Sequence, residues 1–243
     1  MFFFIVALLS AAIGSVTGIG GGLIIRPSLS VLGADIGLAS FTSAACVFVM
    51  SAVSITTRRV WETNIEFRHL IFLAAGTIVG AFAGAYVLLF LSPVLISVLF
   101  IVVMIAIGVL LVLRRYIRPR ITTNPFLGAA IGLITGFFSG LFGIGGGPLQ
   151  MVALMYLFGS KPKDAVLQSL FIAMLASAAA LIQYSINGFA DFSLLLYVIP
   201  GGILGGLIGG VVSKYIKEGT VVVLLFVVIA AVIAGQVYLL ATI

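Results

Sequence analysis

The chain has 243 residues, of which 63% are hydrophobic and only 7% are charged. Its mean hydropathy of +1.40 excludes a soluble globular domain. Apolar runs of about 20 residues, the length that crosses a bilayer as a helix, recur along almost the whole sequence. We therefore expect an all-α, polytopic membrane protein whose surroundings are the lipid bilayer.

The few charged and metal-binding side chains exclude several functions. The net charge of +6 comes from a small number of residues, most of them in loops. No basic run is interleaved with aromatic residues, so we expect no nucleic-acid partner. The single Cys46 excludes an intrachain disulfide and a cysteine-based metal cluster, and the single His69 argues against a histidine metal site. We expect no cofactor.

The predicted elements are ten apolar segments, five in each half of the chain. In chain order they cover residues 2–17, 20–32, 38–57, 69–91, 93–113, 125–142, 148–158, 164–186, 192–213 and 220–241. The second segment of each half, at about 11 to 13 residues, is too short to cross the hydrocarbon core as a straight helix. We expect it to form half of a discontinuous helix or of a re-entrant pair, and the sequence leaves both alternatives open.

The sequence Gly-Ile-Gly-Gly-Gly occurs twice, at residues 18–22 and 143–147. The two halves also align beyond these glycines, for example Ser43 with Ser169 and Ser51 with Ser177. A duplication is the simplest explanation. We predict a first repeat over residues 1–113, a basic linker over 114–124 and a second repeat over 125–243.

Basic residues predict how the repeats are oriented. Four arginines crowd the linker, which we therefore expect in the cytoplasm. In the second repeat, the loops with Lys161 and Lys163 and with Lys214 and Lys217 also favour the cytoplasm, whereas their first-half equivalents lie outside. The sequence thus predicts two inverted repeats, with both chain termini outside the cytoplasm.

Inverted repeats with matching glycine breaks predict a site for an anion. Two helix N-termini would meet near the middle of the bilayer, each with about half a positive elementary charge and free N–H donors. Close helix packing is the alternative role for glycine, and the four-residue spacing of Gly76, Gly80 and Gly84 favours it there. The predicted anion ligands are the backbone groups of Gly18, Gly20, Gly21, Gly22, Gly143, Gly145, Gly146 and Gly147.

Arg26 is the side chain that best fits an anion ligand. A guanidinium in an apolar segment should face a cavity or a partner, and its two-pronged donor set suits a sulfonate, sulfite or carboxylate. The alternative is an arginine whose long stem lets the charge reach the membrane interface. We further expect neutral donors to the anion from Thr42, Ser43, Gln150, Gln168 and Ser169.

These residues resemble the sulfite exporter TauE/SafE family, also called the toluene sulfonate uptake permease family. The resemblance rests on the run from Gly18 to Pro27, the second glycine run and the duplicated layout, and it covers the whole chain. It implies secondary transport of small sulfur-containing anions or organic acids across a bacterial or archaeal inner membrane. The second copy departs from the pattern, since Pro148 directly follows its glycines and Val152 stands where Pro27 does in the first.

The sequence and the resemblance together predict a carrier that works by alternating access. Its expected substrate is a sulfur oxyanion, a sulfonate or a related organic acid. No intramembrane carboxylate stands out as a proton carrier, so a coupled proton would use His69 or travel on the substrate. An anion channel or uniporter is the alternative. An intramembrane enzyme is disfavoured because the chain lacks paired carboxylates, an HExxH motif and a Ser-His arrangement, and an assembly role leaves the glycine breaks unexplained.

Overall fold

The computed structural model describes residues 1–58, 67–113 and 124–241, and the side chains of these except 67–69 and 238–241. Its regular structure is helical throughout these residues. The elements are α1 (Phe2–Thr17), α2 (Gly22–Val31), α3 (Ile36–Thr57), α4 (Phe67–Val87), the 3₁₀ turn η2 (Leu88–Phe90), α5 (Pro93–Leu113), α6 (Pro125–Phe142), α7 (Gly147–Leu157), α8 (Pro162–Ile186), α9 (Leu195–Val212) and α10 (Glu218–Ala241).

Seven of the described helices, namely α3, α4, α5, α6, α8, α9 and α10, are long and apolar enough to cross a membrane, and α1, α2 and α7 are shorter. The predicted all-α polytopic class is confirmed. Local capping explains where the helix ends differ from those predicted. Helix α3 starts at Ile36 because the Asp35 carboxylate accepts a hydrogen bond from the Gly37 N–H at 2.8 Å. Helix α8 starts at Pro162, which suits a first helical turn.

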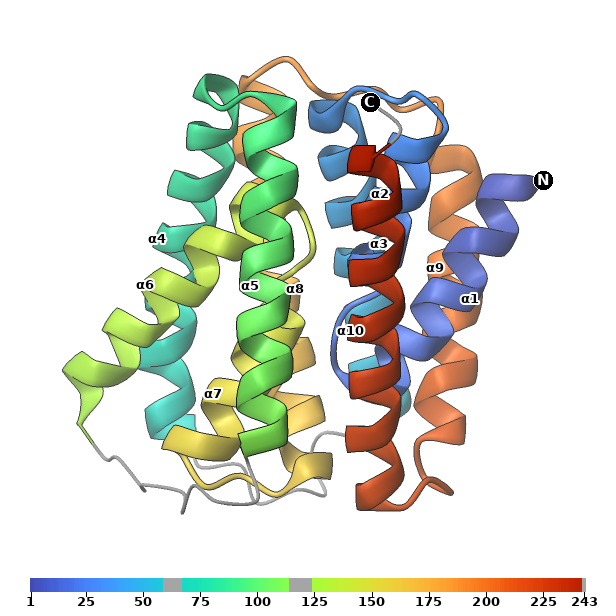
Figure 1. The fold of residues 1–243 in the computed structure, drawn as a ribbon. Helices are drawn as coiled ribbons and strands as arrows, with labels where there is room; N and C mark the ends of the chain where they lie inside the picture. The colour runs from blue at the N-terminus through green and yellow to red at the C-terminus, as the bar shows by residue number, and fades with distance from the viewer. Residues whose placement is uncertain (59–66, 114–123, 242–243) are drawn as a thin grey trace.

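The short helices form two hairpins that enter from opposite faces (Figure 1). Helices α1 and α3 both begin at the top of the view, so the α1–α2 hairpin enters and leaves there. Helices α6 and α8 both begin at the bottom, so the α6–α7 hairpin enters and leaves on that side. Of the two alternatives, this arrangement is the re-entrant one. It agrees with inverted repeats, which stay a prediction together with their boundaries, while residues 114–123 of the linker lie outside the described residues.

Each hairpin packs against a long helix from the other half of the chain. Helix α1 lies along α9, and α6 lies along α4, while α3 and α8 contact each other. The two halves are therefore interleaved, and neither forms its own core.

Glycines allow the closest of these contacts. A Cβ atom added to Gly76, Gly80 or Gly84 of α4 would lie only 2.1, 2.1 or 1.9 Å from a carbonyl oxygen of α6. Helix α9 carries two such series. Gly201, Gly205 and Gly209 face α1, whereas Gly202, Gly206 and Gly210 face α3. The four-residue spacing thus marks a packing seam, as predicted.

We predict that Gly80→Ala destabilises the protein by about 1 to 3 kcal/mol, because the new methyl group would overlap the Leu133 carbonyl oxygen. Gly235→Ala in α10 is the matched control, since no atom lies within 4 Å of its added Cβ and alanine favours a helix by about 1 kcal/mol. Thermal unfolding in detergent measures both. Equal melting temperatures for the two variants would contradict the packing role of Gly80 between α4 and α6.

Candidate functional site

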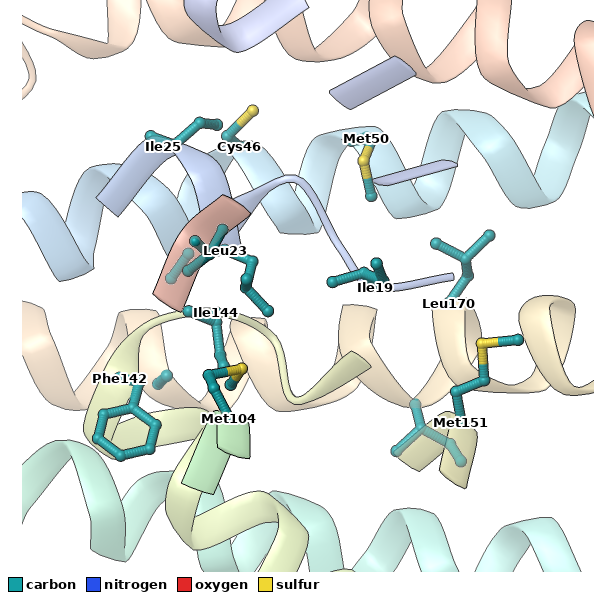
Figure 2. Close-up of a cluster of buried hydrophobic side chains, with 14 of the residues drawn as sticks. Ile19, Leu23, Ile25, Cys46, Met50, Met104, Phe142, Ile144, Met151 and Leu170 are labelled. Atoms are coloured by element: carbon teal, nitrogen blue, oxygen red, sulfur yellow. The ribbon is translucent and has the colours of Figure 1, made fainter. Parts of the chain in front are cut away.

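The two glycine-rich loops, residues 18–22 and 143–147, lie against each other and are buried. A Cβ added to Gly147 would lie 2.1 Å from the Ile19 carbonyl oxygen, and one added to Gly22 would lie 2.9 Å from the Ile144 Cα. Figure 2 shows Ile19, Leu23 and Ile144 within the cluster of buried apolar side chains around the loops. The structure thus brings the two predicted glycine motifs together inside an apolar core.

Each loop begins with a left-handed glycine that ends the preceding helix. Gly18 has φ 73° at the end of α1, and Gly143 has φ 64° at the end of α6. A side chain at this conformation costs about 1 to 2 kcal/mol, which explains why glycine ends both helices.

Serines from α3 and α8 bind the carbonyls of the opposite half's loop. Ser43 Oγ donates to the Gly143 carbonyl at 2.7 Å and lies 3.2 Å from the Gly22 carbonyl. Ser169 Oγ, at the equivalent position, is 3.0 Å from the Gly18 carbonyl and 2.8 Å from that of Val166. These two predicted site residues therefore hold the loops together through their hydroxyls.

Helices α2 and α7 both start at these loops without a side-chain cap, at Gly21 and Gly146 respectively. Their first N–H groups have no partner within the helix, and the helix dipole places partial positive charge there. An anion is the ligand that such helix starts favour.

Arg26 lies in α2, just over one turn past the loop, and is 2% exposed. Its Nε donates to Ser40 Oγ at 3.3 Å, and its guanidinium carbon lies 5.5 Å and 5.8 Å from the ring centres of Phe100 and Phe142. This burial is incompatible with an arginine that reaches the interface. In the described part of the chain, Arg26 has no carboxylate partner, and its guanidinium contacts Ser40 and the two aromatic rings.

Gln150 is buried in the first turn of α7, and neither its Nε2 nor its Oε1 has a hydrogen-bond partner. An unsatisfied buried polar group costs about 1 to 3 kcal/mol. The hydroxyls of Ser139 and Ser177 are also buried and unpartnered, and so is that of the predicted site residue Thr42. These groups can serve a ligand without breaking a bond within the protein.

Sequence reasoning missed Ser139 and Ser177. Ser177 aligns with Ser51, which was a usable signal, whereas Ser139 aligns with Gly14 and carried none. The predicted residue Gln168 lies elsewhere. Its Oε1 accepts a hydrogen bond from Ser160 Oγ at 2.8 Å, which ties it to the turn between α7 and α8.

A narrow gap lies beside the first loop, and it has no room for a water molecule. It is lined by α1, the loop, the start of α2 and Val228 of α10. Ser10, whose hydroxyl is buried without a partner, borders it. The loops are therefore closely packed.

Seven apolar spans and two re-entrant hairpins meeting at a buried polar centre define a multi-pass membrane protein of the transporter class. The family model described as sulfite exporter TauE/SafE matches residues 3–236, and the chain belongs to this family. Its members and the relatives below are transporters, so the protein is a transporter and not an enzyme.

Three similar proteins are described as probable membrane transporters. The probable membrane transporter protein YunE of Bacillus subtilis is 27% identical over 93% of this chain and 92% of its own length. The probable membrane transporter protein YjnA of the same species is 29% identical over 81% and 85%. A probable membrane transporter protein of Methanocaldococcus jannaschii is 31% identical over 74% and 70%. No solved structure matches the chain.

We predict that Gly147→Ala separates the two loops, since its methyl group would overlap the Ile19 backbone. The variant should lose transport in proteoliposomes and melt at a lower temperature. Gly33→Ala is the control, because Gly33 has φ +81° but no atom within 4 Å of an added Cβ, so only backbone strain of about 1 to 2 kcal/mol applies. If both variants lose equal stability and keep transport, the contact between the two loops is not needed for transport.

Proposed function

We propose that the protein is a secondary transporter for a small anion, a sulfur oxyanion, a sulfonate or a related organic acid. The anion binds where α2 and α7 start. The observation that carries this proposal is the meeting of two uncapped helix N-termini at contacting glycine loops, close to one buried arginine.

The electrostatics of the described core favour an anion over a cation. Arg26 is the one charged side chain among the buried polar residues of the described part of the chain. Its positive charge has the same sign as the partial charges at the two helix starts, so their effects on an anion add. A cation at the same place would meet repulsion from all three, and no carboxylate there would offset it.

The arrangement of the hairpins supports alternating access. They enter from opposite faces and touch at their loops (Figure 1). This contact between the loops supports a carrier over an open channel. Movement of one hairpin with the helix it packs against, α9 for α1 or α4 for α6, would expose the loops to one face at a time.

Transport by purified protein in proteoliposomes tests the proposal. The panel is sulfite, thiosulfate, sulfoacetate, taurine and small carboxylates, first screened by thermal shift because a bound ligand stabilises the folded protein. A carrier should show counterflow, in which unlabelled anion inside drives uptake of labelled anion. Ionic conductance without counterflow would favour a channel, and transport of none of these anions would refute the proposal.

We predict that Arg26→Lys weakens anion binding by about 1 to 3 kcal/mol, because lysine lacks the two-pronged donor geometry, and that Arg26→Gln weakens it more. The anion concentration that half-saturates transport in proteoliposomes measures the affinity. Thermal unfolding of the same variants is the control. Unchanged half-saturation with a lower melting temperature would mean that Arg26 only stabilises the contact between α2, Phe100 and Phe142.

We propose that the termini lie outside the cytoplasm, and the described loops allow a test. The connection before α9 lies at the top of Figure 1 with the start of α1 and the end of α10, and the connection after α9 lies at the bottom. In a Cys46→Ala background, an impermeant maleimide should label Asp191→Cys in intact cells and Tyr215→Cys only after permeabilisation. Both positions are exposed, and Cys46 is fully buried. The reverse labelling pattern would mean that the termini lie in the cytoplasm.

A further inference from the structure

Gln150 and Ser139 pack so closely against the start of α7 that Gly146 has no room for a side chain. A Cβ on Gly146 would lie 2.8 Å from Gln150 Nε2 and 3.2 Å from Ser139 Oγ. One on the preceding Gly145 would lie 3.3 Å from Ser177 Oγ. Three buried, unpartnered side chains are thus directed at two successive glycines.

The first half of the chain lacks this polar group. The residues equivalent to Gln150 and Ser139 are Ile25 and Gly14, and only Ser51 corresponds to Ser177. The first half does have buried, unpartnered hydroxyls on Ser10 and Ser51, but it lacks the Gln150 amide and the Ser139 hydroxyl. Their presence at the second loop calls for a ligand and not for a structural role shared by both repeats.

The hydrogen-bonding capacity of Gln150 restricts what that ligand is. The amide Nε2 needs an acceptor and the carbonyl Oε1 needs a donor. The N–H groups at the start of α7 add donors and favour a negative charge. A fully deprotonated anion satisfies the donors but leaves Oε1 unpaired. An oxyanion that keeps one O–H satisfies both.

The next inference rests on the proposed function. We propose that the start of α7 binds a singly protonated oxyanion, such as hydrogen sulfite. The O–H of the ligand donates to Gln150 Oε1, and its other oxygens accept from Nε2, Ser139 and the helix N–H groups. The proton then crosses the membrane on the substrate. This agrees with the described part of the chain, where no carboxylate or imidazole is among the buried residues.

Sulfite and methanesulfonate together test this proposal in proteoliposomes. Both are small sulfur oxyanions, but methanesulfonate has no O–H at neutral pH. The half-saturating concentration of total sulfite should rise about tenfold for each pH unit above the second pKa of sulfite, following the loss of hydrogen sulfite. Competition by methanesulfonate should be weak and should not change with pH.

Gln150→Met should raise the half-saturating concentration of sulfite roughly tenfold, which matches loss of a hydrogen bond to a charged ligand. It should weaken competition by methanesulfonate less than it weakens sulfite binding, because methanesulfonate can accept from Nε2 but has no O–H to donate to Oε1. Gln236→Met, which replaces another buried glutamine on α10, is the matched control and should behave as wild type.

Three outcomes would overturn the proposal. The first is a half-saturating concentration of sulfite that does not change with pH, and the second is methanesulfonate that competes as well as sulfite. The third is the same half-saturating concentration of sulfite for Gln150→Met and Gln236→Met. The first two need only the wild-type protein, so they hold even if the variant does not fold. Failure of every anion in the panel would instead refute the proposed function itself.

Discussion

A helix that ends inside a bilayer must find partners for its backbone groups within the protein, because lipid supplies none and each unpaired group costs several kcal/mol. Helices α1 and α6 both end in this way, at Gly18 and Gly143. Ser169 and Ser43 supply hydrogen bonds to their last carbonyls, each from the opposite half of the chain. The central position of α3 and α8, the buried loops and the interleaving of the two halves all serve this one requirement.

The sequence predicted the features that depend on residue size and on local backbone conformation. The glycine runs, the ten apolar segments and the seam along Gly76, Gly80 and Gly84 are visible because only glycine combines positive φ with close approach. The surroundings of Arg26 could not be predicted, since Phe100 and Phe142 come from helices whose packing the sequence does not specify. The hydrogen bond between Gln168 and Ser160 could not be predicted either, because alignment with Thr42 says nothing about the turn that holds the Gln168 side chain.

The repeat gives the two halves similar backbones but different chemistry at the centre. Arg26 in α2 corresponds to Met151 in α7, and Gln150 in α7 corresponds to Ile25 in α2. One hairpin therefore contributes a fixed charge, and the other contributes a neutral group that both donates and accepts. Under the proposed function, this difference would suit a ligand with two unlike ends.

The interleaved packing has a consequence for how the protein is made. Residues are synthesised from the N-terminus, so the α1–α2 hairpin enters the membrane long before α9, the helix along which α1 lies. The glycine face of α4 likewise has no partner until α6 has been translated. Until then the α1 end at Gly18 lacks the hydroxyl of Ser169. The early chain must therefore be sheltered at the insertion machinery, and the core closes only near the end of translation.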